Sequence, residues 1–519
     1  MDDGKSCTRR SWDAPSAWPV QRRRQGEKKS AVNESVHAAA CRATAPLALP
    51  SELLRPLEQV PLAHCLQRRR GLPRLGAALQ EGVPTESESR TPSKTTGVQP
   101  LRVCYLGGSV TEQKAGWRPR VTSWLQSRLS TNGRRRAVSE IPAFCGNAGS
   151  KLLSFMVRDW VVAHRPDLVF IELAINDGDT LLETDDEESV GAALEGIVRE
   201  LRRVLPACEL CLLTMFLRDD LPLQRRTGSK AWSDNEDSAA ADTYHIRAPA
   251  VHSRVAGRYG VPSINLVPLM ATLSSQARDL VFRDDCHHHN LGAELTAAFI
   301  CAALDRLASA ESAQEAVATR VVERSLATSL STPKPLSLPE PLHPSVWPPG
   351  RAERVTPQQL SFFYLPPSEA RGADMKSVQR RLLERHTQLD LDPLQPTQRA
   401  AWWLLYPGDY AEVQFDGSRL GVLTLVGPDA AFVSYSVDGG AWTGRVCLLD
   451  HWAYYWRLAV VMLVQGLPAG RHVARVRVEA QRPDAAVLKK PPSGEHWDRC
   501  QQEGRDHKLW LMHWLVSDA

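Results

Sequence analysis

The sequence predicts an α/β protein in which a three-layer α/β/α domain built on a parallel sheet precedes a smaller antiparallel β-sandwich domain. Apolar strands alternate with amphipathic helices from Leu101 to Leu307, the pattern of a parallel sheet covered on both faces. Prolines cluster from Pro333 to Pro349, and short alternating runs separated by Gly and Asp turns follow from Ala411. At 519 residues the chain is too long for one hydrophobic core, so two or more domains are expected.

Shifts in composition divide the chain into four segments. Residues 1–97 are rich in Arg, Pro, Ser and Ala, and we expect a disordered or targeting extension there, apart from a short helix near residues 51–57. The remaining segments are predicted as an α/β domain over 98–310, a proline-rich linker with a short helix near 373–386 over 311–397, and a β-sandwich domain over 398–519. Order is expected to begin at Leu101.

The α/β segment contains four predicted strands and five predicted helices. The strands are 101–106, 167–173, 208–216 and 263–266, and the helices are 116–129, 151–164, 187–205, 245–259 and 291–307. The polar stretch from Arg218 to Asp242 interrupts this pattern and is expected to be either a lid or a disordered insertion. In parallel sheets of this kind, ligands bind beyond the carboxyl ends of the strands.

The C-terminal segment reads as a series of short strands. They are predicted at 411–415, 420–426, 432–437, 458–463 and 472–479, with a turn at 438–440. Eight of the 15 tryptophans lie from Trp402 onward. Such aromatic side chains can line a sugar-binding face, but packing in the core and between domains is the favoured interpretation.

Charge and hydropathy exclude several functional classes. The formal net charge is only +4, and most of the basic excess precedes Leu101 in a stretch with few aromatic residues, so nucleic-acid binding is not expected. No apolar run reaches about 18 residues, which argues against a transmembrane segment. A signal peptide is not visible at the N-terminus, and the compartment and the oligomeric state stay open.

The cysteines predict neither a disulfide framework nor a metal or redox site. Eleven are scattered along the chain, and Cys104, Cys208, Cys211 and Cys301 lie in apolar runs typical of small buried side chains. Cys208 and Cys211 form a C-x-x-C pair, but no second pair follows at zinc-finger spacing. No cofactor is expected.

The stretch from Val103 to Thr111 reads as a strand, a glycine pair and a serine that opens a helix. Gly107 and Gly108 permit a tight turn and close backbone approach, and Ser109 then lies at a helix N-terminus, where free N–H groups point outward. Taken alone, this pattern is more often an ordinary helix cap than a nucleophile.

Other parts of the chain carry the groups that a serine nucleophile needs. Asp284 and His287 lie three residues apart on a loop before the last helix, so the carboxylate can bind Nδ1 of the imidazole while Nε2 stays free. Asn176 follows the strand 167–173 and brings an amide donor to the same sheet edge. The stretch 144–150 also precedes a helix and offers backbone N–H groups.

These four segments, in this order, resemble the SGNH or GDSL-type hydrolase family over roughly residues 101–307. The resemblance implies a flavodoxin-like α/β/α fold. It implies a catalytic triad of Ser109 as nucleophile, His287 as base and Asp284 as the residue that orients the base. It further implies an oxyanion hole made by the N–H groups of Ser109 and Gly146 and the side chain of Asn176, with Gly149 as the alternative glycine.

Two positions depart from the usual family pattern. Gly108 stands where the Gly-Asp-Ser form has aspartate, which resembles a Gly-Gly-Ser variant, and His288 stands where a proline commonly follows the histidine. Asp285 and His288 also satisfy Asp-x-x-His, but the family places a glycine five residues after its histidine, and Gly292 selects His287. A metal site made of the three consecutive histidines is disfavoured because consecutive side chains splay apart.

The resemblance implies a serine esterase or acyl-hydrolase that cleaves O-acyl esters. The C-terminal β-sandwich is similar to the domain appended to some carbohydrate esterases, so O-acetyl groups on a glycan are the expected substrate. The partner is thus a small-molecule or glycan ester. Two alternatives remain: an O-acyltransferase that uses the same triad, and a non-catalytic glycan-binding protein.

Overall fold

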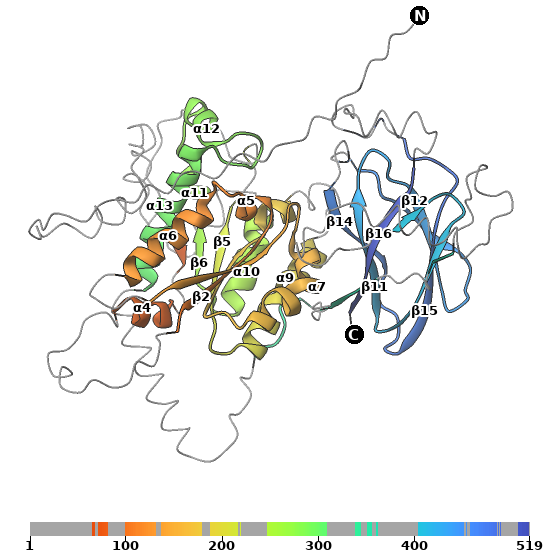
Figure 1. The fold of residues 1–519 in the computed structure, drawn as a ribbon, viewed down its shortest axis with the longest axis horizontal. Helices are drawn as coiled ribbons and strands as arrows, with labels where there is room; N and C mark the ends of the chain where they lie inside the picture. The colour runs from red at the N-terminus through yellow and green to blue at the C-terminus, as the bar shows by residue number, and fades with distance from the viewer. Residues whose placement is uncertain are drawn as a thin grey trace, which may run out of the picture.

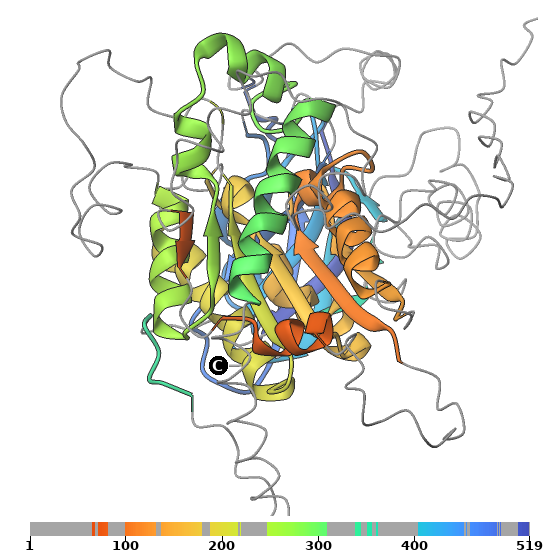
Figure 2. The same cartoon turned by 90° about the vertical axis from the view of Figure 1, so that its left-hand side faces the viewer.

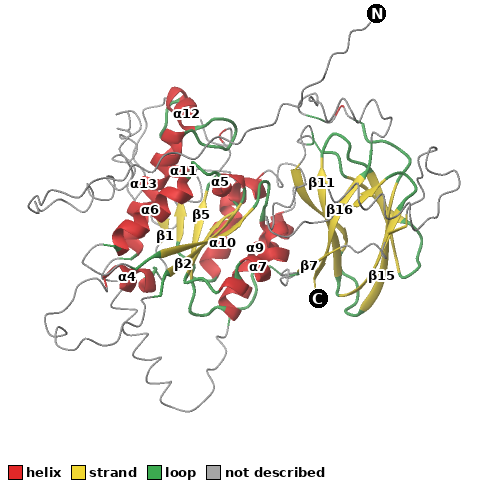
Figure 3. Cartoon of the chain, viewed as in Figure 1, coloured by secondary structure: helices red, strands yellow, loops and turns green. Residues whose placement is uncertain are grey.

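The computed structural model has an N-terminal α/β domain and a C-terminal β domain (Figures 1 and 3). It describes residues 65–67, 71–80, 99–130, 136–178, 187–215, 218, 247–308, 338–343, 350–354, 360–361, 403–450, 453, 457–484, 486, 488 and 507–517.

A mostly parallel sheet forms the centre of the α/β domain. Within the described residues its six strands have the order β1-β6-β5-β4-β2-β3, with β1 antiparallel to β6 and every other pair parallel. The strands are β1 (Leu66–Gln67), β2 (Leu101–Gly107), β3 (Val138–Phe144), β4 (Leu168–Glu172), β5 (Glu209–Thr214) and β6 (Ser263–Asn265). The strand β2 that leads to Ser109 therefore lies inside the sheet, between β3 and β4.

Helices cover both faces of this sheet (Figures 1 and 2). One face packs against α4 (Pro73–Gln80), α6 (Trp117–Leu129), α11 (Val267–Ala271), α12 (Ser275–Val281) and α13 (Asn290–Leu307). The other packs against α7 (Ser150–Trp160), α9 (Glu187–Val204) and α10 (Arg247–Arg258). None of the described helices is long and apolar enough to cross a bilayer.

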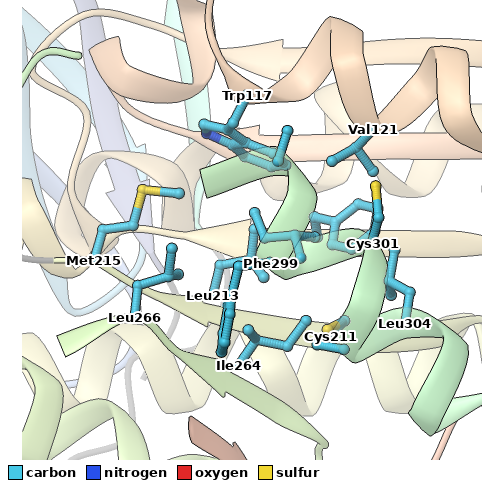
Figure 4. Packing of buried hydrophobic residues seen from close by; sticks show 14 of the residues in the cluster. Trp117, Val121, Cys211, Leu213, Met215, Ile264, Leu266, Phe299, Cys301 and Leu304 are labelled. Atoms are coloured by element: carbon cyan, nitrogen blue, oxygen red, sulfur yellow. The ribbon is translucent and has the colours of Figure 1, made fainter. Parts of the chain in front are cut away.

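The two-residue periodicity of β2 creates the two halves of the core. Tyr105 points into the cluster with α6 and α13, whereas Leu106 points into the cluster with α7 and α9. In the first cluster, shown in part in Figure 4, Trp117 of α6 packs edge-on against Tyr105, which stacks on Phe170 of β4. Large buried side chains thus fix β2 and β4, the strands that carry the candidate site.

The C-terminal domain consists of two packed antiparallel sheets. In the described part of the chain, one has the order β13-β12-β15-β10-β8 and the other β14-β11-β16-β7, with β9 pairing with β16. Their strands are β7 (Arg351–Arg354), β8 (Leu360–Ser361), β9 (Trp403–Leu405), β10 (Tyr410–Asp416), β11 (Arg419–Val426), β12 (Phe432–Val437), β13 (Thr443–Cys447), β14 (Arg457–Val464), β15 (Arg471–Val478) and β16 (Leu509–Ser517). Val413, Val422 and Trp514 belong to the apolar cluster of this domain.

Helix α7 joins the two domains. Its Phe155 and Met156 lie in the same buried cluster as Leu423 of β11 and Trp510 and Leu515 of β16. A methyl group at Gly350, just before β7, would come within 2.1 Å of the Phe155 ring, so the chain passes closely over this helix. The β domain therefore covers the face of α7 that points away from the parallel sheet, as Figure 1 shows.

The predicted fold class, an α/β/α domain followed by an antiparallel β domain, is confirmed. Each strand and helix predicted between residues 101 and 307 is present, with ends shifted by a few residues. The prediction missed β3, an edge strand whose Pro142 interrupts the usual strand pattern. It also missed β16, the central strand of its sheet.

Order begins before Leu101, contrary to expectation. Leu66 pairs with Ile264 across β1 and β6, and the Glu209 carboxylate accepts the N–H groups of Arg74 and Leu75 at the start of α4. Both contacts join segments more than 100 residues apart, so no local pattern predicts them. Strands β7 and β8 likewise lie within the segment predicted as a linker. The helices predicted near 51–57 and 373–386, and the 218–242 loop beyond Arg218, lie outside the described residues.

Candidate active site

Ser109 lies at the carboxyl edge of the parallel sheet. Strand β2 ends at Gly107, Gly108 is the N-cap residue, and Ser109 is the first residue of the short helix α5 (Ser109–Glu112). The backbone at Gly108 is extended, with φ −92° and ψ −155°, so the chain turns sharply between strand and helix. This turn leaves the Ser109 side chain partly exposed while its neighbours Gly108 and Val110 are buried.

The two glycines before Ser109 make room for two different partners. A methyl group at Gly107 would come within 2.3 Å of Thr111 Oγ1, the hydroxyl that donates a 2.9 Å hydrogen bond to Glu172 at the end of β4. A methyl group at Gly108 would come within 1.8 Å of Asn176 Oδ1. The absence of both side chains thus lets the turn pack against β4 and brings the Asn176 amide beside the serine.

The loop before α13 presents His287 to this turn. Asp284 Oδ1 accepts the backbone N–H groups of Cys286 at 3.1 Å and of His287 at 2.8 Å. An aspartate that accepts N–H groups two and three residues further on closes a tight turn. The turn brings the side chains of Asp284 and His287 together, as their spacing predicts.

Ser109, His287 and Asp284 form a continuous chain of hydrogen bonds. His287 Nε2 lies 2.8 Å from Ser109 Oγ, and His287 Nδ1 lies 2.9 Å from Asp284 Oδ1 and 3.0 Å from Oδ2. A carboxylate only accepts, so Nδ1 carries a proton and Nε2 has its lone pair toward the serine hydroxyl. In this tautomer the imidazole can remove the proton of Ser109.

The environment keeps Asp284 ionised. Partial burial by itself raises the pKa of this carboxyl, but the N–H groups of His287 and Cys286 together with the His287 ring lower it below its usual value. A negative charge at Asp284 stabilises the imidazolium that forms when His287 takes a proton.

The three consecutive histidines have different surroundings. His288 is buried with its ring 5.2 Å from that of Phe282, and burial lowers its pKa to about 4, so it stays neutral. His289 is exposed and is the N-cap residue of α13. Of the three, His287 is the one hydrogen-bonded to Ser109, and the ligand atoms of the three do not form a metal-binding group among the described residues.

Two backbone N–H groups of the segment that follows β3 have no partner within the described part of the chain. In the turn between β3 and α7, the N–H of Ala148 donates to Cys145 and that of Ser150 to Asp177, whereas the N–H groups of Gly146 and Gly149 donate to no described residue. Both glycines therefore stay available as oxyanion donors.

A buried network that no sequence pattern indicated lies beneath this turn. Asp177 accepts hydrogen bonds from the backbone N–H and the hydroxyl of Ser150, and His252 Nε2 of α10 lies 2.8 Å from Asp177 Oδ2. Asp177 and His252 are 1% and 0% exposed. The network ties the residue after Asn176 to the start of α7, so it holds the two sides of the candidate oxyanion hole together. A lone histidine in an amphipathic helix carries no sequence signal for such a role.

One family of known proteins matches this part of the chain. Residues 105–295 match the GDSL-like Lipase/Acylhydrolase family. The match lies within the α/β domain. Members of this family are ester hydrolases, so the predicted SGNH-type ester hydrolase is confirmed at the level of the family. No curated protein sequence matches the chain.

The acylhydrolase domain and the β domain together resemble a solved two-domain structure. A two-domain esterase (CEX) active on acetylated mannans superimposes with a TM-score of 0.55 at 15% identity, covering 87% of this chain and 99% of the other. Its form co-crystallised with mannopentaose gives the same TM-score and identity and covers 98% of that chain. An acetyl xylan esterase, AlAXEase, is similar over 39% of this chain and 99% of its own, with 16% identity and a TM-score of 0.31. At these identities the CEX likeness shows a shared fold.

Proposed function

We propose that this acylhydrolase is a serine esterase that removes O-acetyl groups from a carbohydrate. The observation that carries the chemistry is the 2.8 Å contact between His287 Nε2 and Ser109 Oγ, with Nδ1 held by Asp284. The substrate class is supported by the two-domain fold shared with an esterase active on acetylated mannans. The β domain then serves as the accessory domain of a glycan esterase.

The reaction has two steps. Ser109 Oγ attacks the acetyl carbonyl as its proton passes to His287 Nε2, and Asp284 stabilises the resulting imidazolium. The negative charge on the carbonyl oxygen is held by the N–H groups of Ser109 and Gly146, with Gly149 as the alternative, and by the Asn176 side chain. His287 then protonates the departing sugar hydroxyl, and a water molecule that it activates releases acetate from Ser109.

Acetate release from acetylated mannan tests this proposal, with acetylated xylan and p-nitrophenyl acetate as further substrates. Ser109→Ala is expected to abolish release from each of them. Ser154→Ala is the matched control, because the Ser154 hydroxyl donates to Lys151 O within α7 and not to a residue of the triad. Equal turnover by wild type and Ser109→Ala would overturn the proposal.

An assay with an added acceptor sugar separates hydrolysis from acyl transfer. A deacetylated oligosaccharide is added together with p-nitrophenyl acetate, and free acetate and acetylated sugar are followed over time. A hydrolase gives acetate in amounts equal to the nitrophenol released. Accumulation of acetylated sugar in place of acetate would instead assign the triad to an O-acyltransferase.

A further inference from the structure

The loop that carries the base also carries a thiol. Cys286 Sγ lies 3.5 Å from His287 Nδ1 and 3.8 Å from Asp284 Oδ1, and the same Nδ1 lies 2.9 Å from that oxygen. The three ligand atoms lie within 4.8 Å of one another. The turn closed by Asp284 Oδ1 is what brings these three side chains to one side of the loop.

The set of donors suits zinc. Zn²⁺ binds thiolate, imidazole and carboxylate with bonds of about 2.0–2.3 Å in a tetrahedron, which places ligand atoms about 3.3–3.8 Å apart. The two distances from sulfur already fall close to this range, and the nitrogen and oxygen need to separate by only about 0.4 Å. Asp284 is exposed and the other two side chains are half-buried, so an ion and a water molecule as fourth ligand can reach the site.

We propose that Asp284, Cys286 and His287 form an inhibitory Zn²⁺ site that switches off the esterase by capturing Nδ1 of the catalytic imidazole. The inference rests on the proposed function, because it assigns His287 Nε2 the role of base. It concerns Cys286, which takes no part in the reaction described above.

The consequence for catalysis follows from where the protons go. When Nδ1 gives its lone pair to the metal, the proton that it donated to Asp284 moves to Nε2. The Cys286 thiol loses its proton to solvent as the sulfur–zinc bond forms, so one proton is released per ion bound. Nε2 then donates to Ser109 Oγ and cannot accept the serine proton, so acylation stops.

Zinc titration of the esterase activity tests the proposal with three proteins, each compared with its own rate in the absence of metal. Wild type is expected to be inhibited and to recover with EDTA. Cys286→Ala should need about tenfold more zinc or greater for half-inhibition, since two ligands remain of three. Cys447→Ala is the control, because Cys447 is an exposed thiol in the β domain, and it should behave as wild type. Equal zinc sensitivity of wild type and Cys286→Ala would overturn the proposal.

A binding measurement keeps the test separate from the enzymatic activity. Co²⁺ replaces Zn²⁺ and gives a thiolate-to-metal absorption band when it is bound by cysteine. The band is expected in Ser109→Ala, which retains the three ligands but has no nucleophile, and is expected to vanish in Ser109→Ala/Cys286→Ala. If the esterase proposal fails, this pair of spectra still decides the metal site. A band that persists without Cys286, or no band in Ser109→Ala, would contradict it.

Discussion

In the described part of the α/β domain, two aspartate–histidine pairs have opposite surroundings. Asp284 and His287 lie on a loop, and their side chains are 44% and 24% exposed. His287 Nε2 lies within hydrogen-bonding distance of the Ser109 hydroxyl. Asp177 and His252 are fully buried, and Nε2 of the ring is the nitrogen bound to the carboxylate. The other nitrogen, His252 Nδ1, contacts no hydrogen-bonding group among the described residues.

The difference shows what an aspartate–histidine pair needs for catalysis. A base must have one nitrogen oriented by a carboxylate and the other directed at a proton that has to move, within reach of substrate. The buried pair lacks the second condition, and its hydrogen bonds to Ser150 link elements instead. We therefore expect one pair to determine rate and the other to determine stability.

Removal of the exposed histidine is expected to have the largest effect. His287→Ala should lower kcat about 10⁴-fold, because Ser109 loses its base and only binding and oxyanion contacts remain. His472→Ala is the matched control: His472 is bound to Asp438 in the β domain, away from any catalytic serine, and its loss should leave kcat within about twofold. A His287→Ala enzyme that retained more than a tenth of the rate on p-nitrophenyl acetate would argue against the role of this pair.

Neutralising Asp284 should have a smaller effect on the same step. Asp284→Asn is expected to lower kcat about 10³-fold with little change in KM, since the amide no longer stabilises the imidazolium or enforces its tautomer. Asp285→Asn, at the next position of the same loop, serves as the control and should retain near-normal steady-state rates. Equal losses in both variants would indicate that the loop, and not the charge at 284, is being disturbed.

A substitution in the buried pair is expected to lower the stability of the folded protein. Asp177→Asn is expected to lower the free energy of unfolding by about 4 kcal/mol, because it disrupts a buried hydrogen-bonded cluster and leaves polar groups without partners. Urea unfolding at pH 7 measures this change. In the folded variant kcat should fall by less than about tenfold. If Asp177→Asn unfolded like wild type yet lost as much kcat as Asp284→Asn, the distinction between the pairs would fail.

Glu172 is a buried carboxyl whose described hydrogen-bond partner is a threonine and not a histidine. Burial raises the pKa of Glu172 to about 7, although Thr111 donates to it. The folded state therefore holds a proton that the unfolded chain releases above about 4.5, the ordinary pKa. The stability contributed by this group is fully present below that value and is lost as pH rises through about 7.

Glu172→Gln should accordingly gain stability relative to wild type at high pH. The gain is expected to be near zero at pH 4 and about 2 to 3 kcal/mol at pH 9, measured by urea unfolding across the pH range. Glu209, whose pKa burial also raises to about 7, retains its own pH dependence in both proteins and cancels in the difference. A gain independent of pH would mean that Glu172 is already ionised when folded.

Local patterns predicted the parts of this molecule that depend on nearby residues. The alternation of strands and helices gave the fold class, and the Asp284–His287 spacing gave the triad loop because that turn closes within four residues. The two glycines predicted a tight turn, but the structure adds which side chains fill their space, Thr111 and Asn176. The Asp177–His252 contact joins residues 75 positions apart, so no local sequence pattern predicts it. The hydrogen bonds from the backbone N–H groups of residues 342 and 343 to Glu195 of α9 could not be predicted either, since the proline-rich composition there predicts a linker.

The most direct test of the account is the reaction of the enzyme with a fluorophosphonate, followed by mass spectrometry of its peptides. The reagent bonds its phosphorus to an activated serine oxygen with loss of fluoride, and it needs the base but no natural substrate. A single adduct is expected on Ser109 in wild type, and its formation should be greatly slowed in His287→Ala and unaffected in His472→Ala. An active wild-type enzyme that gave no adduct at Ser109, or one that formed equally fast without His287, would contradict it.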